Sequence, residues 1–109
     1  MALIADRDQF ISVSGGMKGL FGKALSKELE EKLDNRESVQ AQRGDRNFIT
    51  IAIDDEDSYV QQTIVPVICE GDVIGAVLLL NADVKAKMGE TELKLAQSAA
   101  GFLGRQMEQ

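Results

Sequence analysis

The C-terminal helix most constrains the fold, because it carries more apolar residues than one interface can cover. At about 100° per residue, the helix predicted over Glu90–Met107 has two neighbouring apolar stripes. The first stripe consists of Leu93, Ala96, Ala100, Leu103 and Met107. The second consists of Leu95, Ala99 and Phe102. One stripe can pack on the chain's own domain, so the other predicts a further partner, most simply a second copy of the chain. We expect the first stripe to join the copies in a homodimer or higher homo-oligomer.

Length, charge and residue inventory exclude several functions. The 109 residues suffice for one domain with one core. A net charge of −6 argues against direct binding of a phosphate backbone by this chain. Histidine is missing, and with it the usual general base near neutral pH, so we do not expect an enzyme. The longest apolar run, Val73–Leu80, is too short to cross a bilayer, so no membrane association is expected.

No cofactor or metal site is predicted. Cys69 is the single cysteine, which excludes an internal disulfide and a multi-cysteine metal site and fits a reducing, cytoplasmic location. Its neighbours Ile68 and Glu70 would not lower the pKa of the thiol, so a structural role is favoured over a reactive one. The acidic run Asp54–Asp57 lacks the glycines and spacers of a metal loop and is interpreted as a solvated loop.

Hydrophobic periodicity predicts an α+β domain. Val73–Leu80 is apolar on both faces and should be a central strand, and Glu70-Gly71-Asp72 before it is a good hairpin turn. Ser26 is a plausible N-cap for the regular part of the first helical segment. Short turns join successive strands, which predicts a mainly antiparallel sheet of five strands, with helices packed on it. The predicted strands are Ala2–Ala5, Gln9–Ser14, Asn47–Ile53, Tyr59–Ile68 and Val73–Leu80, and the predicted helical segments are Met17–Arg36 and Glu90–Met107.

Three arginines border the polar, irregular segment Glu37–Arg46. Arg36, Arg43 and Arg46 could together hold a carboxylate or phosphate ligand, because guanidinium groups bind such anions through two hydrogen bonds. They could equally form a solvated face that neutralises nearby acidic side chains. The sequence leaves both alternatives open.

Several motifs resemble known families. The hairpin made by Pro66–Ile68 and Gly71–Leu78 resembles that of GAF domains, which show a proline, a glycine turn and an Ile-Gly-hydrophobic run. The ending from Met88 to Gln109 is similar to that of SpoVT-like sporulation regulators. Further similar points are Asp6–Gly15, Asp57–Tyr59 and Gly71–Val77.

The resemblance implies that residues 1–109 are a single GAF-like regulatory domain with a long C-terminal helix. SpoVT-like proteins join such a domain to an N-terminal DNA-binding domain of the AbrB type. We expect that domain, and the first GAF helix, to be missing from this chain, so DNA would be bound only by the missing part. The signatures of GAF domains that bind cyclic nucleotides or bilins, or that reduce methionine sulfoxide, are also missing. By elimination, any ligand should be small and anionic and should contact Arg36, Arg43 and Arg46.

Two functions follow as hypotheses. In the first, the domain is a sensor of a sporulation transcription factor that couples a small ligand or an assembly state to DNA binding elsewhere. In the second, it is a purely structural oligomerisation module that binds no small molecule. A closed, polar-lined pocket between the sheet and the Arg36–Arg46 segment would favour the first. An apolar, filled interior would favour the second.

Overall fold

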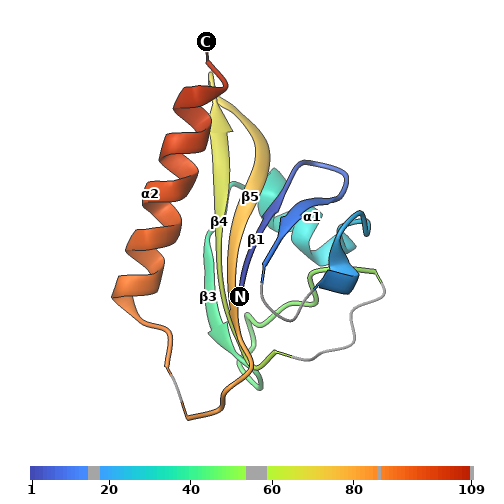
Figure 1. The fold of residues 1–109 in the computed structure, drawn as a ribbon, viewed down its shortest axis with the longest axis vertical. Coiled ribbons are helices and arrows are strands. Elements are labelled where there is room, and N and C mark those ends of the chain that lie inside the picture. The colour runs from blue at the N-terminus through green and yellow to red at the C-terminus, as the bar shows by residue number, and fades with distance from the viewer. Residues whose placement is uncertain (15–17, 54–58, 86, 109) are drawn as a thin grey trace.

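The computed structural model describes residues 1–14, 18–53, 59–85 and 87–108. They form a five-stranded sheet in the order β2-β1-β5-β4-β3, with antiparallel pairing between neighbours. Helix α2 covers one face and α1 lies on the other (Figure 1). The predicted α+β class and sheet are confirmed. The elements are β1 (Ala2–Ala5), β2 (Phe10–Val13), the 3-10 helix η1 (Lys18–Leu20), α1 (Lys27–Asp34), β3 (Val39–Gln42), β4 (Gln61–Cys69), β5 (Asp72–Asn81) and α2 (Glu90–Gln106).

The β4–β5 hairpin is the centre of the sheet. Strand β5 lies between β1 and β4, which confirms the central position that its two apolar faces predicted. The pairing of Val65 with Val77 points one set of side chains toward α2. The hairpin turn at Glu70 and Gly71 has positive φ at both residues, 51° and 85°, which is the backbone of a type I′ turn.

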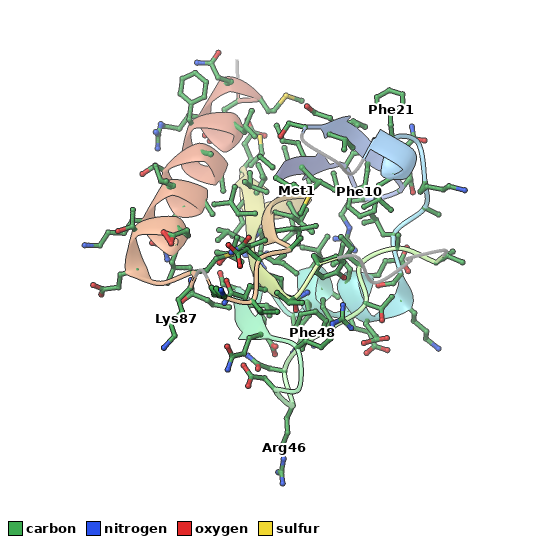
Figure 2. The ribbon with its side chains drawn as sticks, turned by 60° about the horizontal axis from the view of Figure 1, so that its bottom comes forward. Met1, Phe10, Phe21, Arg46, Phe48 and Lys87 are labelled. Atoms are coloured by element: carbon green, nitrogen blue, oxygen red, sulfur yellow. The ribbon has the colours of Figure 1, made fainter. Side chains whose placement is uncertain are left out.

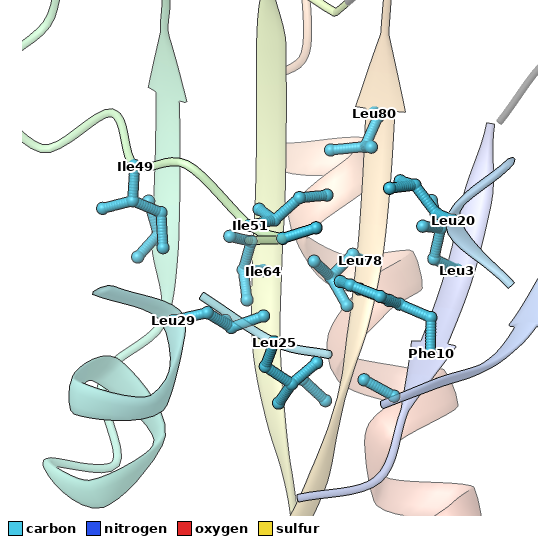
Figure 3. Packing of buried hydrophobic residues seen from close by; sticks show 14 of the residues in the cluster. Leu3, Phe10, Leu20, Leu25, Leu29, Ile49, Ile51, Ile64, Leu78 and Leu80 are labelled. Atoms are coloured by element: carbon cyan, nitrogen blue, oxygen red, sulfur yellow. The ribbon is translucent and has the colours of Figure 1, made fainter. Parts of the chain in front are cut away.

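A packed apolar cluster fills the α1 face of the sheet (Figure 3). Phe10, Leu29, Leu33, Ile64 and Leu78 are each 0% exposed. Each such side chain contributes about 1.5–3 kcal/mol relative to leaving it in water. Helix α1 presents its two leucines to this cluster, and Ser26 caps it by accepting a hydrogen bond from Leu29 N at 3.0 Å, as predicted.

The predicted strand over Asn47–Ile53 is wrong. Ile49 and Ile51 are buried, as the alternation of apolar residues predicted. The backbone of this segment, however, does not form a strand of the sheet. The Gln62 side chain pairs with Ile49 instead, accepting from its N–H and donating to its carbonyl, both at 2.9 Å. The next bonds go to the segment before α1, where Ser26 N donates to Ile51 O at 2.9 Å. Strand β3 lies in the segment that was predicted to be irregular.

The helix predicted over Met17–Arg36 is correct only at α1 and in the short 3-10 turn at Lys18–Leu20. Gly22 has φ of 79°, a conformation that glycine adopts readily and that ends the helical backbone at this point. Beyond it, Lys23 O accepts from Phe10 N at 3.1 Å and Asp8 O accepts from Leu25 N at 3.2 Å, so the backbone pairs with the second strand rather than with itself. The acidic run Asp54–Asp57 and Met17 lie outside the described residues.

Candidate functional site

Helix α2 packs on its own sheet through small residues spaced one turn apart. Ala96, Ala100 and Gly104 are buried, and they cover valines of β4 and β5. The approach is closest at Gly104, where a Cβ atom would stand 2.2 Å from the Ile68 carbonyl oxygen. A side chain there would push the helix off the strand, so glycine allows the contact.

This packing corrects the face predicted for self-association. Ala96 and Ala100 are 1% and 3% exposed, and Leu93 and Leu103 are half-buried in the same cluster. Those four residues are therefore covered by the chain's own β4 and β5. Of the first stripe, Met107 alone stays exposed, at the helix end. The small residues decided which stripe faces inward, because they let the helix approach the sheet most closely.

The second stripe is the one left open. Leu95 is 60% exposed and Phe102 is 55% exposed, and Ala99 lies exposed between them. Residues spaced by three and four positions lie on one side of a helix. The three side chains therefore make a continuous apolar strip, which we call the α2 strip, and it is the candidate interface of this domain.

The start of α2 is fixed firmly to the sheet. Gly89 is the N-cap, its N–H donates to the Glu92 carboxylate at 3.2 Å, and Glu90 and Glu92 lie at the positive end of the helix. Gln40 of β3 donates from Nε2 to the Gly89 carbonyl at 2.8 Å. The α2 strip is thus carried on a rigid element.

The three arginines predicted to share one ligand are not brought together. Arg36 precedes β3 and donates to the Gly71 carbonyl in the β4–β5 turn. Arg43 follows β3, and its backbone N–H donates to the Val60 carbonyl at 2.7 Å. Val60 immediately precedes β4, so this contact lies at the opposite end of that strand. Nine residues of β4 separate the two places, roughly 27 Å. One small molecule cannot contact both.

Arg43 and Arg46 differ from each other as well. The Arg43 guanidinium lies over the Phe48 ring at 4.8 Å and the Tyr59 ring at 5.7 Å, and it donates to the Tyr59 carbonyl. It borders an open hollow of about 410 Å³. Arg46 projects away from the body of the molecule (Figure 2). Because its guanidinium stacks on these two rings, Arg43 has a structural role. Anion binding at this end of the sheet stays a prediction.

Among the described residues, the interior beneath the segment Arg36–Arg46 is apolar, whereas a polar-lined pocket would have favoured the sensor hypothesis. Between the sheet and the segment Arg36–Arg46, the described residues contribute buried apolar side chains, among them Leu33, Val39 and Ile49. Polar atoms buried nearby are satisfied locally, since Gln62 is held by Ile49. Sequence reasoning missed this glutamine, because a polar residue in a strand usually indicates the solvent face.

Cys69 lies half-buried at the end of β4. Burial raises the pKa of its thiol, and the carboxylates of Glu108, Glu70 and Asp72 raise this pKa further. The neutral thiol is therefore favoured, which agrees with a structural rather than a reactive cysteine. Within the described ranges, no three acidic or cysteine side chains are grouped to hold a metal ion. Nor does any described helix have the length and hydropathy of a membrane span.

Comparison with known proteins places the chain in a family. The family model described as "Stage V sporulation protein T C-terminal, transcription factor" matches residues 1–108. The chain belongs to this family. Stage V sporulation protein T of Bacillus subtilis strain 168 is 42% identical over 109 residues, which cover 98% of this chain and 58% of that protein. This chain from the SpoVT C-terminal family therefore spans little more than half the length of that relative.

Solved structures of low sequence identity share the fold. A type II free methionine-R-sulfoxide reductase from Thermoplasma acidophilum matches with a TM-score of 0.69 and 12% identity, covering 95% of this chain and 75% of that one. A far-red absorbing protein in its dark state with bound biliverdin matches with a TM-score of 0.67 and 14% identity, covering 98% and 78%. The SpoVT C-terminal domain therefore has a GAF-like fold, as the hairpin motif predicted.

Proposed function

We propose that this domain regulates a sporulation transcription factor by controlling how its copies assemble, and that it catalyses no reaction. DNA would be contacted by a part of the protein outside this chain, and the protein would act in the cytoplasm. The family supports the regulatory role. The single observation that carries the assembly step is the α2 strip, which leaves Leu95 and Phe102 more than half exposed on a rigid helix.

Burial of the α2 strip between two copies of the chain provides the driving force for self-association. Aromatic and long aliphatic side chains such as Phe102 and Leu95 supply most of the free energy at protein interfaces. A helix pairing with its own copy makes a two-fold contact in which each strip covers the other. The position of the DNA-binding parts would then depend on whether the helices are paired, which links assembly to DNA binding.

A second candidate is a purely structural module that brings copies together and binds nothing small. The filled apolar interior on the α1 face favours it over a ligand held inside the domain. An anionic ligand contacting Arg43 and Arg46 remains a prediction. Arg36 lies at the other end of β4, beside Gly71, and could not contact the same ligand.

The test is the mass of the domain in solution. Light scattering after size exclusion should show association that increases with concentration up to the high micromolar range. Phe102→Glu should abolish it, because an unpaired buried charge costs several kcal/mol. Gln97→Glu is the matched control: it adds the same charge to an exposed position of α2 about 160° around the helix from Leu95. A monomer at high micromolar wild-type concentration, or equal loss in both variants, would contradict the proposal.

A further inference from the structure

A second hollow lies on the other side of β3 and β4 from the apolar cluster. Its volume is about 240 Å³, and Gln40, Gln42, Asp45, Gln61, Lys87 and Met88 contribute to its lining. Pockets for drug-sized molecules are larger, about 300–1,000 Å³. The hollow therefore suits a molecule smaller than a typical drug.

Gln61 lies between this hollow and the one beside Arg43, and it carries a hydrogen-bond donor that no described residue accepts. The residue is 5% exposed. Its Oε1 accepts from Asn81 Nδ2 at 3.1 Å and from Met88 N at 3.2 Å, which fixes which end of the amide is oxygen. Among the described residues, no group accepts a hydrogen bond from its Nε2. The Nε2 group is therefore free to donate a hydrogen bond to a ligand that offers an acceptor.

The lining also carries one charge of each sign. Asp45 follows β3, and its Oδ2 is held by Gln42 N at 2.9 Å. Lys87 precedes α2 and lies exposed beside the start of that helix (Figure 2), where its flexible stem allows the ammonium to turn toward the hollow. A purely anionic ligand would meet Asp45, and a purely cationic one would meet Lys87. A molecule with both charges satisfies both.

We propose that this hollow binds a small zwitterion of the α-amino acid class. The ligand carboxylate accepts from Gln61 Nε2 and pairs with Lys87, and the ligand ammonium pairs with Asp45. The hollow and the α2 strip share no residue, so this inference does not depend on the proposed self-association.

The test is titration of the isotope-labelled chain with each of the twenty common L-amino acids, followed by NMR. At least one should shift the Gln61 side-chain amide signals and the Met88 backbone signal in a saturable manner. Succinate, which carries negative charges alone, and putrescine, which carries positive charges alone, should bind at least tenfold more weakly. Both exposed charges can be removed without touching the core, and Lys87→Gln and Asp45→Asn should each weaken binding about tenfold.

Lys85→Gln is the matched control, because Lys85 is equally exposed two positions earlier and does not line the hollow. Unchanged affinity in this variant supports the site. The inference is overturned if no amino acid shifts the Gln61 signals, if succinate binds as well as the best amino acid, or if Lys85→Gln weakens binding as much as Lys87→Gln. Failure here would leave the mass measurement on Phe102→Glu unaffected, so the two proposals fail separately.

Discussion

Gly104 sets how closely α2 lies on β4, and replacing it with alanine should separate the two. The new Cβ would stand 2.2 Å from the Ile68 carbonyl oxygen and 3.2 Å from its carbon. Carbon and carbonyl oxygen atoms normally stay about 3.3 Å or more apart. The last turn of the helix must therefore retreat by roughly 1 Å.

The cost of this retreat exceeds the gain in helix propensity. Alanine is about 1 kcal/mol more favourable than glycine inside a helix. A gap of about 0.5–1 Å forfeits a quarter to a half of the dispersion attraction between the surfaces, here between Ala100 and the valines beneath it. Overpacking of this kind typically costs about 1–3 kcal/mol. Because the clash is with rigid backbone, we expect a cost near the upper end of this range and a net loss of about 2 kcal/mol, which lowers Tm by roughly 8–12 °C for a domain of this size.

Gly101→Ala provides the comparison on the same helix. Its Cβ would meet the Arg105 side chain, with Nη1 at 3.3 Å, and a flexible guanidinium can move aside. This variant should gain stability, by up to about 1 kcal/mol. Urea denaturation followed by circular dichroism gives both free energies of unfolding. The reasoning fails if Gly104→Ala is as stable as wild type, or if Gly101→Ala loses as much as Gly104→Ala.

Three further substitutions test the sheet and its thiol. Gly75→Val should reduce the free energy of unfolding by about 1–3 kcal/mol and so lower the urea midpoint, because a Cβ there would stand 2.0 Å from the Ala5 carbonyl oxygen; an unchanged midpoint would refute the close packing. Glu70→Asn should raise Tm, since asparagine tolerates the φ of 51° better and roughly 0.5–1 kcal/mol of strain is relieved; a lower Tm would argue against the type I′ turn. Cys69 should be alkylated by iodoacetamide more slowly at pH 8 than an unstructured cysteine peptide, because its raised pKa leaves less thiolate, and Glu108→Gln should speed the reaction. Equal rates in all three samples would contradict that assignment.

Elements with strong internal patterns were predictable from the sequence. The central strand β5 showed apolar residues on both faces, and α2 showed helical periodicity with acidic residues at its start. The Ser26 cap and the Glu70-Gly71 turn followed from local chemistry alone. Each of these signals lies within the segment that it describes, so no knowledge of a distant partner was needed.

Pairing partners were not predictable, and this caused the error at Asn47–Ile53. Alternation reports which side chains face inward, and Ile49 and Ile51 do. It does not report where the backbone hydrogen bonds go. The Gln62 side chain takes them at Ile49, while the weakly apolar strand β3 pairs along β4. Neither segment contains a local sequence signal that shows which of the two pairs with β4.

Which residues of the predicted sites lie together could not be read from the sequence. The sequence showed that α2 has two apolar stripes, but which one faces inward depends on the fit of Gly104 against Ile68. Likewise, Arg36 and Arg43 are close in sequence, yet β3 between them carries them to opposite ends of β4. Both errors arose because proximity in the chain is a poor measure of proximity across a sheet.

The pairing of β1 with β5 has a consequence for the order of folding. Ala2 pairs with Leu79, so the sheet joins segments from opposite ends of the chain, and such distant contacts slow folding. The β4–β5 hairpin and α2 are contiguous and can order together with short loops to close. During synthesis, β1 and β2 emerge long before β5, and a two-stranded hairpin alone is marginally stable. We expect the C-terminal half to form first and the docking of β1 along β5 to be the slow step that completes the domain.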